Sequence, residues 1–175
     1  VAHIVSSVQA VAQEMGLPVP SDTEAANIIG LSLHRAMEVL FPEVPPRELE
    51  ALISGYSSHY VASEEAPPDL FPGALETLLE LKGRGFELAV ATGKSRRGLN
   101  RVLRRLEMEE LFDATRCADE TTSKPDPHML HELMRERSAA PEQVVMVGDT
   151  EYDLEMAVNA GVASVGVSFG VHSVE

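Results

Sequence analysis

The sequence predicts an α/β protein in which a wholly helical region precedes a doubly wound region of alternating helices and parallel strands. In residues 1–62 apolar side chains recur every three or four positions, and no segment has the alternating pattern of a strand. From residue 74 onward, helical segments alternate with short runs of β-branched residues. Such alternation is typical of a parallel sheet with right-handed crossovers. With 175 residues, 44% of them hydrophobic, the chain can bury one good core and a smaller accessory one.

Four amphipathic helices are expected in the first region. The first occupies residues 1–15 and ends at Gly16. Ser21 and Glu24 have the spacing of a capping box, which opens a short second helix that runs to about Gly30. The third and fourth helices carry apolar faces that we expect to form a packed core rather than a cofactor site. These faces consist of Leu33, Ala36, Met37, Leu40, Leu49, Leu52, Ile53, Tyr56 and Tyr60.

A linker is expected at residues 63–68, where two glutamates and two prolines interrupt the helical pattern. Beyond it, helices and strands alternate. The predicted helices centre on residues 75–82, 99–106, 129–134 and 154–160, and the predicted strands are 86–91, 114–117, 144–147 and 163–167.

The composition excludes several classes of protein. A formal net charge of −14, from 28 acidic and 14 basic residues, argues against a nucleic-acid backbone or an anionic membrane surface as the partner. The sequence has neither an apolar run of membrane-spanning length nor a leader pattern. The single Cys117, in an apolar strand, excludes an internal disulfide and fits a reducing compartment. We therefore expect a soluble cytoplasmic protein, a monomer or a homodimer.

Two aspartates follow the predicted strand at residues 144–147, whose four apolar residues are typical of a buried parallel strand. Asp149 comes directly after Gly148, and Asp153 falls in the first turn of the next helix. Both carboxylates can therefore face the crevice beyond the carboxyl ends of the strands, where ligands bind in such sheets. Hard oxygen ligands suit Mg²⁺. The alternative, equally open on this stretch alone, is that Asp153 only caps its helix.

Two further positions are suited to binding an anion. Thr92 ends one predicted strand and Gly93 follows it, so a hydroxyl and backbone N–H groups can face the same crevice. Lys124 lies between Ser123 and Pro125 in a loop that the prolines fix, where a positive charge would stabilise a phosphoryl group. Thr92 taken alone could equally be a simple helix cap, and a lone lysine before a proline is more often an ordinary solvated residue.

Taken together, Thr92-Gly93, then Lys124-Pro125, then Gly148-Asp149 with Asp153 resemble motifs two, three and four of the haloacid dehalogenase-like hydrolase superfamily. The resemblance covers nearly the whole chain, including Phe71-Pro72-Gly73, and is strongest to members of the phosphoglycolate-phosphatase type. It implies a helical cap domain at residues 1–66 and a Rossmann-like core at residues 67–175 that lacks its first strand.

The resemblance also implies a mechanism and site roles. An aspartate nucleophile would form an aspartyl-phosphate that water hydrolyses. Thr92 would hydrogen-bond the phosphoryl group together with Gly93, Lys124 would neutralise it, and Asp149 would bind Mg²⁺. Asp153 would hold a metal-bound water or orient Lys124. The substrate implied is a small phosphorylated metabolite, with phosphoglycolate the first candidate.

The chain departs from the family pattern in one respect, because no Asp-x-Asp-Gly-Thr sequence occurs in it. In relatives this motif, which contains the nucleophile, lies on a central strand just before the first cap helix. We therefore expect it upstream of Val1, and a chain truly starting there would be inactive by this route. A non-catalytic phosphate- or Mg²⁺-binding module is then the alternative. A phosphomutase would need further cap residues, and a dehalogenase has no use for the pair Asp149 and Asp153.

Substrate choice in this family belongs to the cap. The segment around Gly30 carries His34 and Arg35, and the Arg35 cation could hold a carboxylate or phosphate of the substrate. The more frequent reading of such a residue is a solvated helix face. His128 and His131 have no accompanying ligand set and are expected to be ordinary surface residues.

Overall fold

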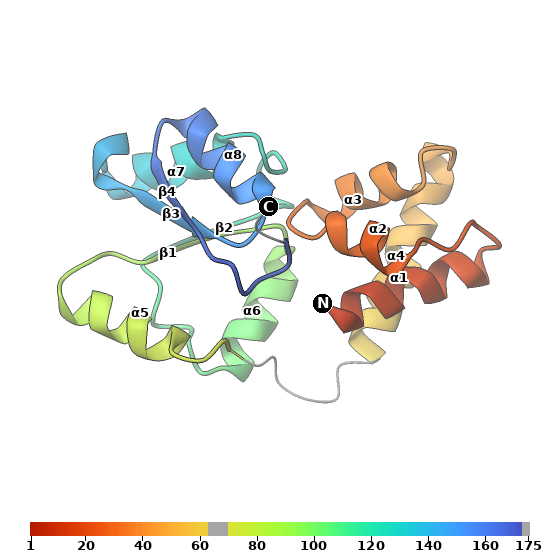
Figure 1. Cartoon of the computed structure of the whole chain (residues 1–175), viewed down its shortest axis with the longest axis horizontal. Coiled ribbons are helices and arrows are strands. Elements are labelled where there is room, and N and C mark those ends of the chain that lie inside the picture. The colour runs from red at the N-terminus through yellow and green to blue at the C-terminus, as the bar shows by residue number, and fades with distance from the viewer. Residues whose placement is uncertain (63–69, 173–175) are drawn as a thin grey trace.

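The computed structural model describes residues 1–62 and 70–172, which form a helical region and an α/β region lying side by side (Figure 1). The linker predicted at residues 63–68 lies outside the described residues. Within those residues, no helix combines the length and the apolar character that crossing a membrane requires.

The helical region contains the four expected helices. The capping box is confirmed, because the Ser21 hydroxyl accepts the Glu24 N–H and the Glu24 carboxylate accepts the Ser21 N–H. The second helix ends at Asn27, earlier than predicted, and Ser32 caps the third. The bounds are α1 Ala2–Glu14, α2 Asp22–Asn27, α3 Leu33–Leu40 and α4 Pro46–Ala62.

A single core holds these helices together. Val8 and Ala12 of α1 are fully buried with Met37 of α3 and Leu52 of α4. Gly55 of α4 permits the close approach to α1, since a Cβ there would lie 2.6 Å from the Val11 side chain. The apolar periodicity read from the sequence is therefore the packing surface of the helical region.

The α/β region alternates helices and strands in the predicted order. Each strand is four residues long, and the first is shorter than the stretch expected at residues 86–91. The last helix ends at Gly161, whose φ of 72° gives the left-handed cap that glycine favours. The elements are α5 Ala74–Gly83, β1 Ala89–Thr92, α6 Arg96–Arg105, β2 Ala114–Cys117, α7 His128–Arg137, β3 Val145–Gly148, α8 Glu151–Ala160 and β4 Ala163–Gly166, with a 3₁₀ turn at Pro141–Gln143.

The strands pair in parallel, as predicted, and the described strands form two sheets that separate between β1 and β3. In one, β1 pairs with β2, so that Thr92 lies opposite Cys117. In the other, β3 pairs with β4, so that Gly148 lies opposite Gly166. Among the described strands, β1 and β3 are not hydrogen-bonded to each other, and each therefore keeps one unpaired edge.

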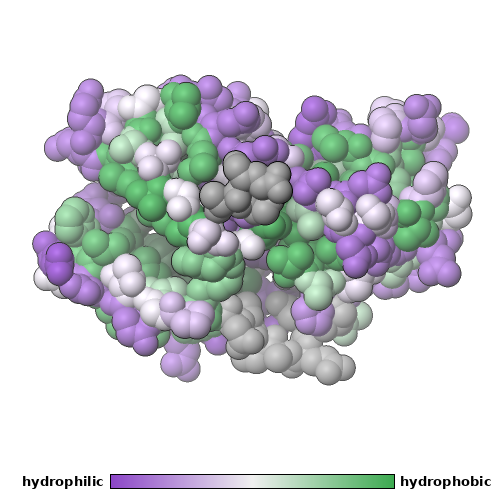
Figure 2. Space-filling model, viewed as in Figure 1, coloured by the Kyte–Doolittle hydropathy of each residue, from purple (hydrophilic) through white to green (hydrophobic). Residues whose placement is uncertain are grey.

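The prediction that the strand at residues 144–147 is buried was wrong for one of its faces. Met146 and Val144 pack against the cluster formed by α7 and α8, which includes Met129 and Met156. Val145 and Val147, on the opposite face, are however 58% and 60% exposed, and β3 pairs with only one of the described strands. Figure 2 shows apolar side chains exposed on this region.

Candidate functional site

The carboxyl ends of the strands open into a cleft of about 1010 Å³ that also reaches the helical region. Because β1 ends at Thr92 and β3 at Gly148, the residues that follow them meet at this edge. The cleft brings together five of the six predicted site residues, which are Thr92, Gly93, Lys124, Asp149 and Asp153.

A buried ion pair lies at the centre of the site. The Lys124 ammonium donates to Oδ1 of Asp153 at 2.5 Å, and the two side chains are only 6% and 5% exposed. The other carboxylate oxygen, Oδ2, accepts the N–H and the hydroxyl of Thr150 at 3.2 and 2.8 Å. Asp153 therefore does cap α8, as the simpler interpretation held, but it also pairs with a lysine 29 residues away.

Gly148 allows this pair to form beside the strand. A Cβ at position 148 would lie 2.3 Å from Cβ of Asp153, closer than any two such atoms can approach. The glycine that ends β3 is therefore required by the close packing of Asp153 against the backbone. The sequence Gly-Asp thus combines a steric requirement with an acidic group.

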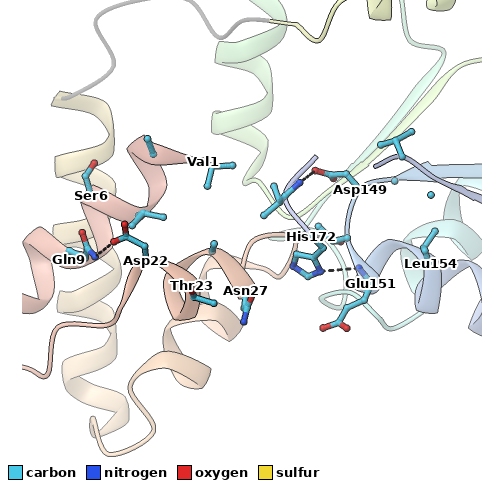
Figure 3. Close-up of a pocket in the computed structure, with 18 residues that line it drawn as sticks. Val1, Ser6, Gln9, Asp22, Thr23, Asn27, Asp149, Glu151, Leu154 and His172 are labelled. Carbon is cyan, nitrogen blue, oxygen red and sulfur yellow. Dashed lines mark hydrogen bonds between the residues drawn. The ribbon is translucent and has the colours of Figure 1, made fainter. Parts of the chain in front are cut away.

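Asp149 is held by a turn near the end of the described chain. Its Oδ2 accepts the Val171 N–H at 2.8 Å, and its backbone carbonyl accepts the His172 N–H at 3.2 Å. A Cβ at Gly170 would lie 2.1 Å from Cβ of Asp149, so this turn can approach only with glycine there. Figure 3 shows Asp149 beside a second hollow of about 1210 Å³, which α1 and α2 also line. Asp149 therefore faces open space on two sides.

The first loop of the site lies directly against the helical region. The Thr92 hydroxyl accepts the Lys94 N–H at 3.2 Å, and a Cβ on Gly93 would lie 2.4 Å from the Leu31 carbonyl oxygen. The next residue of the helical region, Ser32, donates its N–H to the hydroxyl of Ser123 at 2.9 Å. The segment between α2 and α3 thus touches both the Thr92 loop and the Lys124 loop.

Arg35 does not belong to this group of residues. It lies on α3, with a side chain that is 58% exposed and 3.1 Å from Glu38, and it does not line the cleft. In this structure Arg35 therefore lies on a solvated helix face, the alternative considered above. His34 likewise pairs with Glu38, and His128 with Glu132.

Sequence reasoning missed several residues that line or support the cleft. Lys94 and Tyr60 face each other in it, with the Lys94 Nζ 5.5 Å from the centre of the Tyr60 ring. Lys94 directly follows the strand-end pair Thr92-Gly93 in the sequence, and this position could have indicated a role in the site. Tyr60 and the support from Gly170 gave no such signal, because both depend on contacts between distant segments.

Mg²⁺ suits the donors of Asp149. Within the described chain, Oδ1 of Asp149 makes no hydrogen bond, and no cluster of three or more His, Cys, Asp or Glu occurs there. Mg²⁺ commonly takes one or two protein carboxylates and completes its shell with water and substrate phosphate. Asp149 fits that pattern as a direct ligand. Asp153 has both oxygens engaged and fits better as the residue that positions Lys124.

An α/β fold that gathers a threonine, a buried lysine and two aspartates at its strand ends defines a protein that binds a small ligand at that edge. Comparison with known proteins identifies the family. The sequence profile described as haloacid dehalogenase-like hydrolase matches residues 1–167. The chain therefore belongs to the haloacid dehalogenase-like hydrolases, which confirms the resemblance found in its motifs.

Individual relatives agree with this assignment. A protein of Dickeya dadantii named "Probable phosphatase IndB" is 32% identical, over 98% of this chain and 76% of that protein. A phosphoglycolate phosphatase of Agrobacterium fabrum is 29% identical, over 97% of this chain and 75% of that protein. A solved structure from Bacteroides fragilis, named as a haloacid dehalogenase-like hydrolase, is 28% identical with a TM-score of 0.90. That match covers 98% of this chain and 82% of the other.

Proposed function

We propose that this chain forms the cap and most of the core of a Mg²⁺-dependent phosphatase that hydrolyses a small phosphorylated metabolite. The observation that carries the proposal is the buried pair of Lys124 and Asp153 beside Asp149, in a cleft that also contains Thr92. A buried lysine fixed by a carboxylate is a rigid positive charge, and such preorganised charges stabilise a transferring phosphoryl group.

Each residue has a distinct role in this proposal. The Thr92 hydroxyl and the N–H of Gly93 bind the phosphoryl oxygens, and Lys124 neutralises their charge. Asp153 holds Lys124 in place through its own bonds to Thr150. Asp149 would hold Mg²⁺, which when bound shields an attacking carboxylate from the anionic phosphate.

The nucleophile in this proposal is an aspartate on a strand encoded upstream of Val1. Two features of the described residues support it. The facing strands β1 and β3 each keep an unpaired edge, and Val145 and Val147 of β3 are exposed although their sequence is typical of a buried strand. A central parallel strand inserted there would pair both edges, and its side chains on the same face would flank the valines and reduce their exposure. Its carboxyl end would come beside Thr92 and Asp149, and an aspartate there could form the aspartyl-phosphate.

We further propose that residues 1–66 act as the cap domain and residues 67–175 as the core. The cap would choose the substrate, since α4 and the segment after α2 line the same cleft as Thr92. Phosphoglycolate is the first candidate, because the relative from Agrobacterium fabrum carries that name.

The first experiment is to determine the intact mass and N-terminal sequence of the natural protein, and then to screen phosphate esters with and without Mg²⁺. We expect an upstream Asp-x-Asp-Gly-Thr segment, Mg²⁺-dependent phosphate release, and strong loss of turnover in the Asp149→Asn variant. A natural protein without that segment, or wild-type turnover by Asp149→Asn, would overturn the proposal. The first outcome would favour a non-catalytic phosphate- or Mg²⁺-binding module.

A further inference from the structure

We propose that the cleft contains a second anion-binding subsite, formed by Lys94 and Arg97 with the ring of Tyr60. This subsite would select phosphate monoesters that carry a second anionic group. The inference rests on the proposed phosphatase function and adds a recognition element at the cap side of the same cleft.

The first argument is the distribution of charge. The whole chain has a formal net charge of −14, yet the described residues that line the cleft include four basic and only two acidic side chains. Lys124 and Asp153 neutralise each other as an ion pair. Among the described lining residues, the cations Lys94 and Arg97 then outnumber the one remaining acid, Asp149. A cleft walled by one sign of charge concentrates ligands of the opposite sign.

Lys94 is placed to meet a ligand rather than to stabilise the fold. Among the described carboxylates, none forms an ion pair with Lys94 or with Arg97. By contrast, Lys82, Arg96, Arg116 and Arg137 all pair with glutamates or aspartates. The Lys94 ammonium instead lies 5.5 Å from the centre of the Tyr60 ring, a geometry that orients a cation without neutralising it. Its charge therefore remains available to an anion.

The position of Lys94 in the chain ties it to the phosphoryl site. Its backbone N–H donates to the Thr92 hydroxyl, so the two residues belong to one tight loop. Lys94, Thr92 and Lys124 all line the same cleft, so a ligand with its phosphate at Thr92 and Lys124 would share that cleft with the Lys94 side chain.

The opposite wall of the cleft would not repel a second anion. It comes from α4, whose described lining residues are serines, tyrosines and small apolar side chains without a carboxylate. Tyr56 stacks on Tyr60 with ring centres 5.9 Å apart, and burial raises the pKa of Tyr56, so its phenol stays neutral. Arg101 also lies 5.9 Å from the centre of the Tyr60 ring, so two cationic side chains are close to that ring.

The test compares three substrates in the complete protein by steady-state phosphate release. Phosphoglycolate carries a carboxylate as its second anion, a short-chain bisphosphate carries a second phosphate, and ethyl phosphate carries neither. In Lys94→Met we expect the kcat/KM ratio of a two-anion substrate to ethyl phosphate to fall about tenfold or more, the loss typical of one charge-assisted contact. Lys82→Met, which removes a lysine outside the cleft, should leave every ratio unchanged.

Substitutions of Tyr60 test whether its aromatic ring positions the Lys94 ammonium or only fills space. Tyr60→Phe keeps the ring and should preserve the ratio, whereas Tyr60→Leu should lower it by a few-fold. The substrate whose ratio falls in Lys94→Met identifies the second group as carboxylate or phosphate. Equal losses for all three substrates would place Lys94 in the phosphoryl site itself and overturn the second subsite.

Failure of the subsite can be distinguished from failure of the proposed function. If the wild-type protein hydrolyses none of the three esters, calorimetric binding of phosphoglycolate and ethyl phosphate to wild type and Lys94→Met still tests the subsite. Tighter binding of phosphoglycolate by wild type, lost in Lys94→Met, would support it. Equal binding of both ligands by wild type would refute it.

Discussion

The helical region and the α/β region bury their apolar side chains to very different degrees. In the helical region, α1, α3 and α4 enclose one core in which Val8, Met37 and Leu52 are fully buried. In the α/β region, two separate clusters lie on either side of two short sheets, and Val147 remains 60% exposed. The helix α5 has no buried residue among those described.

This difference shows where each region obtains its stability. In the helical region the first helix, α1, packs mainly on the last, α4, so the described helices close their core among themselves. A parallel strand needs neighbours on both sides and layers on both faces. In the described residues, β3 has one neighbouring strand and one covered face. It therefore lacks hydrogen bonds along one edge and apolar burial on one face. The candidate site lies at this less complete edge.

The largest effect is expected from Lys124→Ala. Removing the ammonium leaves the buried carboxylate of Asp153 without its cation, and breaking such a pair typically costs about 3–5 kcal/mol of unfolding free energy. Turnover should also fall on the order of a hundredfold or more. Urea unfolding and steady-state kinetics measure the two effects.

Lys82→Ala is the matched control for that variant. It removes a lysine whose pair with Asp113 is 35% and 27% exposed, and should cost at most about 1 kcal/mol. Equal losses in the two variants would mean that the pair in the cleft is not more protected from solvent than a surface pair. The site would then not be the rigid part of the α/β region.

The next prediction sets the two regions directly against each other. Leu52→Ala, in the closed core of the helical region, should cost about 2–5 kcal/mol of unfolding free energy. Val147→Ala, on the exposed face of β3, should cost less than about 0.5 kcal/mol in the chain as described. Chemical denaturation monitored by circular dichroism measures both.

Repeating Val147→Ala in the complete protein sharpens the comparison. If an upstream strand pairs with β3, the same substitution should then cost about 1 kcal/mol or more, because the side chain becomes buried. An unchanged small cost would contradict the proposed position of that strand.

The sequence allowed the prediction of nearly all helices and of the order of the strands, because these depend on local periodicity. Ser21 with Glu24 and Gly161 were sufficient to predict the start of α2 and the end of α8. The sequence also supported the grouping of Thr92, Lys124 and Asp149 at one site, since the carboxyl ends of parallel strands lie at the same edge of a sheet.

What the sequence did not reveal depends on contacts between distant segments. The exposure of Val145 and Val147 follows from how strands pair, and their residue types alone suggested burial. Arg35 was considered for the site because of its charge, but the geometry of α3 turns it toward Glu38. The approach of Tyr60 to Lys94 joins residues 34 positions apart and has no local pattern.

A more moderate effect is expected from Gly170→Ala. The added Cβ would press against Asp149 and displace the turn whose Val171 N–H holds the Asp149 carboxylate. We expect the Mg²⁺ concentration for half-maximal activity to rise about tenfold, as is typical when support for a metal ligand is disturbed. The thermal midpoint should change little. Gly83→Ala, where a Cβ meets no atom within 4 Å, is the control. An unchanged Mg²⁺ requirement would show that the turn does not position Asp149.

The smallest predicted effect concerns Glu120, in the better-packed part of the α/β region. Its carboxylate accepts both Nε and an Nη of Arg96 at 2.7 Å, and this pairing lowers the pKa of Glu120 below its ordinary value of 4.5. A lowered folded-state pKa contributes stability above the unfolded pKa and loses it as the pH falls through the folded value. Because the pair is partly exposed, Glu120→Gln should cost at most about 1 kcal/mol near neutral pH.

That cost should shrink as the pH falls below the ordinary value of 4.5 and through the lowered folded-state pKa, because the wild-type carboxylate itself then becomes protonated. Thermal unfolding of both proteins across this range measures the difference. A cost that persists unchanged in acid would mean that the hydrogen-bond geometry, and not the charge of Glu120, joins the start of α6 to the end of β2.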